Sequence, residues 1–206
     1  AAHNEAMAAN AAGDREEGRA LYEVTFEARQ RVLGCEHVDT LKTRCNFGLA
    51  LRNAGRPCEA EAELRATWQS LQRVMGSRHP LSLTTLQNLS LALAGRAKSE
   101  SSLAALQAAV FLAIEAVQGK QQILGFEHFE SLEALRDLGA LQAELGRNAE
   151  AESTWRQALG GLQRSLGFQH PTTIGVLEQL RSLLAAEQAS ILEAEHRLGQ
   201  IVSALP

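Results

Sequence analysis

The sequence predicts an all-α protein, an α-solenoid of stacked antiparallel helix pairs, from three observations. First, a Leu-Gly-x-x-His frame, with Met for Leu in one copy, recurs four times, and its histidines step by 42, 49 and 42 (37 to 79, 79 to 128, 128 to 170). A fixed period of this size is typical of repeat architectures. Second, the chain is rich in alanine, has few aromatic residues and contains only four prolines, which suits closely packed helices. Third, apolar residues between the frames recur at helical spacing.

The spacing between glycines in the later copies, applied to the start of the sequence, predicts that the chain begins inside a repeat. Residues 14–33 then form a B helix, and residues 3–12 form the tail of an A helix, in which Asn4 falls on the register of Asn46. We expect further repeats or a capping segment before residue 1.

The first full unit has an A helix over 39–54, a Gly55-Arg56 turn and a B helix that runs to the next Leu-Gly. Both helices are amphipathic at the helical period. The apolar positions of the A helix are Leu41, Cys45, Gly48 and Leu49, and those of the B helix are Ala60, Leu64, Trp68 and Leu71.

The B helices align with one another when residues are counted from the glycine before each. The fifth residue is small, and the ninth and thirteenth are large, which predicts one continuous core through the stack. These positions are Gly18, Ala60 and Ala151, then Tyr22, Leu64 and Trp155, then Phe26, Trp68 and Leu159.

The third unit is irregular. Its Gly95-Arg96 turn comes two residues early, and a polar stretch over 98–102 follows. We expect a longer loop there, or a B helix that starts at about 102 with extra turns. The run Leu103 to Ile114 is almost entirely apolar, which predicts burial on most sides and makes the segment 97–124 a candidate partner contact. The alternative is an ordinary insertion with local repacking.

The last unit is expected to have an A helix over about 172–186 and a final B helix from Ala189 to Leu205. The stripe of that final helix is Ile191, Ala194, Leu198, Ile201 and Val202. The array as a whole is one domain over 1–206, with units at about 1–33 (partial), 34–75, 76–124 (insertion near 97–103), 125–166 and 167–206 (terminal).

The repeat unit resembles tetratricopeptide repeats of the kinesin light chain type. The resemblance lies in the order of its motifs, which are Leu-Gly-x-x-His-Pro, Asn-Leu, Gly-Arg and Ala-Glu-Ala-Glu. The period of that type equals the step from His37 to His79 and is longer than the usual repeat of about 34 residues. The resemblance covers about 3–175. It departs from the pattern at Val38 and Phe129, which replace the proline kept as Pro80 and Pro171. It implies a right-handed superhelix that binds a protein or peptide in a concave groove lined by the A helices.

In that family the asparagine of the Asn-Leu pair faces the groove and holds the backbone of the ligand. The resemblance carries this role to Asn46 and Asn88, and less strongly to Asp137 and Gln179, which stand at the same register. A carboxamide suits it because it both donates and accepts hydrogen bonds. The alternative is that these groups bond between neighbouring A helices and serve stacking.

The charges of successive A helices change sign along the array. The first helix is basic, the second uncharged and the third acidic, which favours a ligand of opposite polarity along its length with an apolar middle. The residues are Lys42, Arg44 and Arg52 against Asp39 in the first helix, and Glu130, Glu133, Asp137 and Glu144 against Arg136 in the third.

No motif points to catalysis, a cofactor or a metal. The histidines His37, His79, His128 and His170 recur at the same turn, about one repeat apart, which favours a structural role in which each imidazole bonds backbone. Neither His3 nor His196 has a metal-like neighbour pattern. Cys35, Cys45 and Cys58 fit no zinc or disulfide pattern, so we expect reduced thiols in a helical core.

The net charge of −4 argues against a general nucleic-acid binder. No run of about 18 apolar residues is evident, so we expect no membrane insertion. A cytoplasmic location is the default, with an organelle as the alternative if a targeting segment has been removed.

The function that these patterns favour is a non-catalytic protein–protein interaction scaffold that binds a peptide or protein segment in its groove. Two alternatives remain. One is a structural subunit or assembly factor of a larger complex, with contacts through its convex face, its ends or the irregular segment. The other is an accessory repeat domain of a larger enzyme.

Overall fold

The computed structural model describes the backbone of residues 15–203 and the side chains of residues 15–190. The predicted A-helix tail over 3–12, with Asn4 and His3, lies outside the described residues. The side chains of His196 and of the stripe from Ile191 to Val202 also lie outside them.

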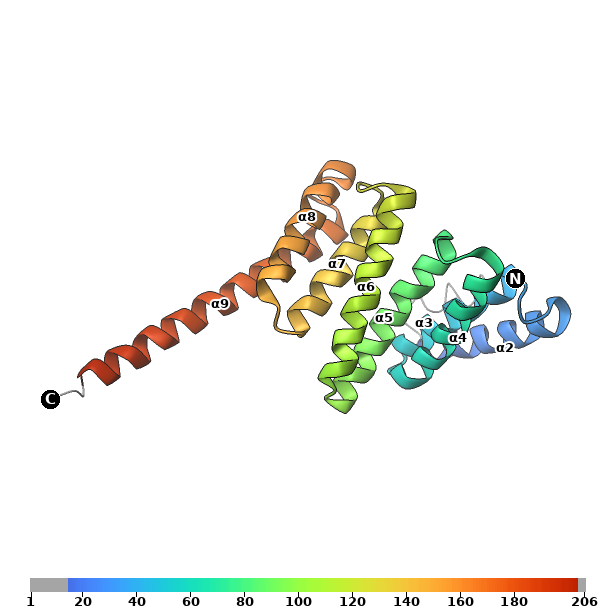
Figure 1. Ribbon diagram of the computed structural model, residues 1–206, viewed down its shortest axis with the longest axis horizontal. Helices are drawn as coiled ribbons and strands as arrows, with labels where there is room; N and C mark the ends of the chain where they lie inside the picture. Colours follow the sequence, from blue (N-terminus) through green and yellow to red (C-terminus); the bar gives the residue numbers. More distant parts are fainter. Residues whose placement is uncertain (1–14, 204–206) are drawn as a thin grey trace.

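All elements in the described part of the chain are helices, and each packs against the next in sequence (Figure 1). The B helices are α2 (Arg15–Leu33), α4 (Pro57–Met75), α6 (Leu103–Leu124) and α8 (Asn148–Leu166). The A helices are α3 (Val38–Asn53), α5 (Pro80–Glu100), α7 (Phe129–Glu144) and α9 (Pro171–Ser203). The predicted α-solenoid of helix pairs is confirmed.

The turn from each B helix to the next A helix has the same construction in all four copies. A glycine with φ between 85° and 97° ends the B helix, in a region of φ that residues with a Cβ rarely adopt. A histidine follows three residues later, and it is extended at His37, His79 and His128. In all four copies its Nδ1 accepts the backbone N–H two residues further on, at 3.1–3.2 Å. The side chains of His37, His79, His128 and His170 are therefore the N-caps of the A helices.

The turn from A to B depends on a glycine at a fixed distance along the chain from the capping histidine. Gly55 and Gly146 hold this register after His37 and His128, both have φ of 78°, and they follow the ends of α3 and α7. In the third unit the register holds Ala97, and α5 continues to Glu100. The predicted turn at Gly95-Arg96 is wrong, because both residues lie within α5.

Two serines make the turn between α5 and α6 instead. Ser101 adopts a left-handed conformation with φ of 51°, and the Ser102 hydroxyl accepts the backbone N–H of Ala105 as the N-cap of α6. The expected longer loop is therefore wrong, and the alternative of a B helix from about 102 is right.

The last helix does not turn back. Its residue at the same register is Gln188, and α9 is one continuous helix of 33 residues. The predicted break after about 186 and the separate helix from Ala189 are wrong. The C-terminal part of α9 projects away from the rest of the stack (Figure 1).

The core follows the predicted columns of the B helices. The small fifth and large ninth positions are buried in each aligned copy, and the thirteenth positions are half-buried. Two of the large side chains meet a glycine of their own A helix: a Cβ at Gly48 would lie 2.6 Å from Leu64, and one at Gly139 would lie 2.5 Å from Trp155. The crossings of α3 with α4 and of α7 with α8 therefore require glycine at these two positions.

The apolar helix α6 is less buried than predicted. Ala105, Ala109 and Ala113 are buried, but Leu103 and Phe111 are exposed, so burial on most sides is wrong. By length and composition alone α6 is apolar enough to cross a membrane, which corrects the expectation that no such segment exists; core helices pass the same test. In this fold it packs against α5 and α7.

The cysteines also depart from the prediction of a common core location. Only Cys45 is buried, whereas Cys35 and Cys58 are exposed, and all three are free thiols.

Candidate functional site

The A helices lie side by side along one side of the stack. Each contacts the next A helix directly, α3 with α5, α5 with α7 and α7 with α9, whereas successive B helices contact one another less. In a curved stack, helices on the concave side lie closer to one another than helices on the convex side. The A helices therefore lie on the concave side.

One stripe of each A helix stays open to solvent, and we call these stripes together the A-helix face. None of its residues is buried. It comprises Lys42, Asn46, Leu49 and Asn53 in α3, Thr84, Asn88, Leu91 and Gly95 in α5, Glu133, Asp137, Ala140 and Glu144 in α7, and Gly175, Gln179, Ser182 and Ala186 in α9.

The register predicted to face the ligand lies on this face; its residues are Asn46, Asn88, Asp137 and Gln179, and the first three bond to neighbouring helices. Asn46 bonds to the phenol of Tyr22 in α2; the pKa of Tyr22 is raised because burial disfavours the phenolate, and this bond opposes the rise. The Asn88 amide donates to the Sγ of Cys45 in α3 at 3.6 Å. Asp137 accepts from Gln87 of α5 at 2.6 Å, whereas Gln179 is exposed.

The thiol of Cys45 lies beneath the face. It accepts from the Thr85 hydroxyl at 3.3 Å as well as from Asn88, and burial raises its pKa while both bonds lower it. A buried thiol with a raised pKa is a poor nucleophile, so Cys45 serves packing.

The three predicted cations have different surroundings. Lys42 is exposed on the A-helix face. Arg44 turns toward the B helices, where its Nε lies 2.7 Å from Glu63 Oε2 and its guanidinium lies 5.5 Å from the centre of the Phe26 ring. The pKa of Arg52 is lowered, chiefly by burial, although the nearby Asp137 raises it. Arg52 in α3 thus interacts with a charge in α7, two units further along.

A polar network that the sequence did not predict joins α5, α6 and α7. Lys120 of α6 is only 2% exposed; its Nζ donates to Gln87 Oε1 at 2.7 Å and lies 3.3 Å from Glu130 Oε2. The Gln87 amide donates in turn to Asp137, and Thr84 donates to Glu130 at 3.3 Å. A buried cation is tolerated when it is paired in this way. The one available signal was a lone lysine in an apolar helix.

The acidic end of the face is partly neutralised. Arg136 contacts Asp137 at 2.9 Å, and the pKa of Glu133 is raised, first by burial, with Arg136 opposing and Asp137 adding to the rise. Among the predicted charges of the A helices, Lys42 and Glu144 are exposed and form no ion pair in the part of the chain whose side chains are described. The face therefore carries a free cation near one end and a free carboxylate near the other.

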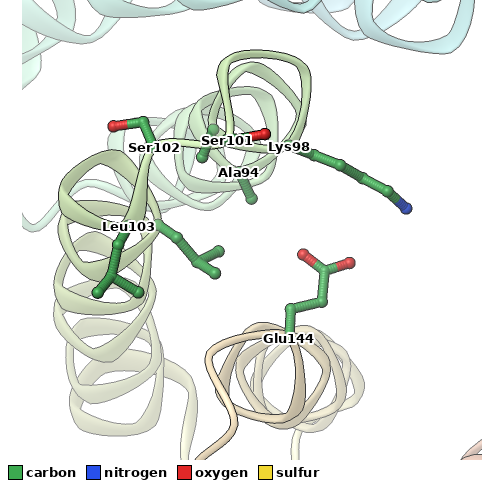
Figure 2. A pocket seen from close by; sticks show the side chains of 8 residues that line it. Ala94, Lys98, Ser101, Ser102, Leu103 and Glu144 are labelled. Carbon is green, nitrogen blue, oxygen red and sulfur yellow. The ribbon is translucent and has the colours of Figure 1, made fainter.

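A pocket of about 340 Å³ lies next to Glu144, at the turn between α5 and α6. Its apolar lining is Ala94, Ala97, Leu103 and Leu106. Figure 2 shows Glu144 pointing toward this space from α7, while Lys98 extends beside it from α5. The pocket exists because α5 lacks the glycine that ends α3 and α7.

The four turn histidines each cap a different helix, and no group of three or more His, Cys, Asp or Glu side chains that could hold a metal occurs among residues 15–190. The fold and the face define a class, the helical-repeat solenoids.

The comparisons with known proteins narrow this class. Residues 1–67 match the family model described as tetratricopeptide repeat. The TPR-like repeats of a protein described as a kinesin light chain from Podosopora anserina match with a TM-score of 0.72, 22% identity and coverage of 98% of this chain and 92% of that one. A single-substitution variant of the same repeats matches with a TM-score of 0.74, the same identity and the same coverage.

BtubC (BKLC) from P. vanneervenii matches with a TM-score of 0.71 and 15% identity, over 98% of this chain and 79% of that one. A comparison with curated proteins finds no match. The fold is that of tetratricopeptide-type repeats like those of kinesin light chains, so the predicted resemblance is confirmed. Repeats of this type generally mediate protein–protein interactions, and the fold is typically non-catalytic.

Proposed function

We propose that the protein is a non-catalytic scaffold that binds an extended protein segment along its A-helix face. The observation that carries the proposal is the continuity of that face. The same four register positions stay open in all four A helices, and in α3, α5 and α7 most of the positions beside them are buried.

The chemistry of the face suits a peptide backbone. Asn46 and Asn88 each use part of their hydrogen-bonding capacity inside the protein. A carboxamide has two donors and two acceptor lone pairs, so capacity remains for a ligand. Leu49 and Leu91, one turn further along, offer half-exposed apolar surface for side chains of the ligand.

The free charges suggest the direction of the ligand. Lys42 would attract an acidic residue at one end, and Glu144, beside the pocket, would attract a basic residue at the other. The pocket next to Glu144 has space for an apolar anchor at that end of the ligand. The ligand polarity predicted from the charges of the A helices is therefore kept in the proposal, but it now depends on Lys42 and Glu144 alone.

The test uses peptides selected from a random phage-displayed library on the wild-type protein. Their affinities are measured by fluorescence anisotropy for the wild type and for Lys42→Glu. We expect weakening of roughly fivefold to tenfold, about 1–1.4 kcal/mol, because a charge at the rim changes sign. The matched control is Arg31→Glu, the same reversal on the exposed surface of α2. Arg44 is unsuitable because its charge contacts Glu63.

An assembly role has one observation in its favour, the exposed Leu103 and Phe111 on α6. If Lys42→Glu and the pair Asn46→Ala/Asn88→Ala leave binding unchanged while Phe111→Glu, outside the pocket, abolishes it, the A-helix face is not the binding surface. The irregular unit would then be the contact.

A further inference from the structure

The last A helix has one face packed and one face uncovered. On its packed face Thr173, Val176 and Leu180 are buried where α9 lies against α8 and α7. The equivalent residues of the earlier A helices also pack against the preceding unit, so this side of α9 is an ordinary repeat interface.

The uncovered face holds the residues that, in every earlier unit, contact the following B helix. Ile174, Leu177 and Leu184 are 40%, 50% and 38% exposed. The leucines at the same registers of the earlier A helices are no more than 3% exposed; they are Leu41, Leu83 and Leu132, then Leu86 and Leu135, then Leu51 and Leu93. A pocket of about 470 Å³ runs along this face beside Leu177, Arg181 and Leu184. Exposed apolar surface of this kind is stabilised by a partner.

A regular B helix does not fit this face. Gly48, Ser90 and Gly139 hold the register at which the B helix comes closest, and a Cβ at Gly48 or Gly139 would already clash with that helix. In α9 the same register holds Arg181. The occupant must therefore pack at a greater distance and must offer a negative charge to the guanidinium.

A second copy of α9 meets both requirements. Glu178 lies one turn before Arg181, both are exposed, and neither forms an ion pair within the side chains that the structure describes. We propose that the protein forms a two-fold symmetric dimer in which two α9 helices pack antiparallel through this face. An antiparallel pair centred between these residues brings Arg181 opposite Glu178 of the partner copy, and symmetry makes the contact twice.

The pairing also matches the apolar positions. With the same centre, Ile174 lies opposite Ala185 of the partner copy, so a large side chain meets a small one. Leu177 and Leu184 flank the two charge pairs and exclude water from them. The surface is thus complementary to itself in charge and in size.

The test is analytical ultracentrifugation of the full chain between about 1 and 100 μM. We expect the wild type to sediment as a dimer within this range. Arg181→Glu and Glu178→Arg each place like charges opposite one another and should weaken dimerisation at least tenfold. The double variant recreates both pairs in reverse and should restore dimerisation to within about threefold of the wild type. Leu177→Asp should give a monomer with an unchanged circular dichroism spectrum.

The control is Arg156→Glu, a reversal on the exposed surface of α8 that should leave dimerisation unchanged. A wild type that stays monomeric at about 100 μM overturns the proposal. A dimer that survives Leu177→Asp overturns it, and so does a double variant as weak as the singles.

Discussion

At the scale of single residues, the recurring histidine is a joint of the solenoid. Its Nδ1 accepts a backbone N–H at the start of each A helix, a role that Ser, Thr, Asp and Asn usually fill. The glycine before it ends the B helix with positive φ. The structural roles of this glycine and histidine at each turn explain why the Leu-Gly-x-x-His frame recurs along the chain.

This role predicts the effect of replacing one cap. His79→Ala should lower the free energy of unfolding by about 1 kcal/mol, because one N–H at the start of α5 loses its acceptor. His79→Asn should retain most of the stability, since an amide oxygen can accept the same bond. Urea unfolding at neutral pH followed by circular dichroism measures both. Equal loss in the two variants would contradict the capping role.

At the scale of helices, the length of each A helix depends on one register. The glycines at this register, Gly55 and Gly146, end α3 and α7, and the absence of glycine there lets α5 and α9 continue. The sequence contained this information, but the Gly95-Arg96 dipeptide resembled the other turns and concealed the missing glycine. Gly95 instead provides space, since a Cβ there would lie 3.1 Å from Pro57.

Helix packing predicts opposite outcomes for two adjacent glycines in α8. A Cβ at Gly161 would lie 2.4 Å from Leu132, whereas one at Gly160 meets only Arg164 at 3.6 Å. Gly161→Ala should destabilise by about 1–3 kcal/mol through overpacking. Gly160→Ala should stabilise by up to about 1 kcal/mol, because alanine favours helix. Thermal melting compares them directly, and a loss of stability in both variants would contradict the prediction that only Gly161 is required by packing.

At the scale of the whole molecule, periodicity predicted the helix pairs and the core columns, and the family resemblance predicted a shared face for Asn46, Asn88, Asp137 and Gln179. Periodicity did not predict which helices the long charged side chains contact. Arg44 shares an A helix with Lys42 but reaches Glu63, and Lys120 pairs with α5 and α7 across the stack. Such contacts depend on how helices distant in sequence pack, which a repeat period does not specify. Of the charges that formed the predicted gradient, only Lys42 and Glu144, near the two ends of the A-helix face, are therefore free to contact a ligand.

The central claim, that the A-helix face binds a protein segment, is tested most directly by photo-crosslinking. Library-selected peptides that carry a benzophenone side chain are irradiated with the wild-type protein, and the crosslinked residues are identified by mass spectrometry. The proposed function predicts crosslinks within 42–53, 84–95 and 133–144, at the open registers of α3, α5 and α7. Crosslinks confined to the B helices or to the segment 97–124 would contradict it.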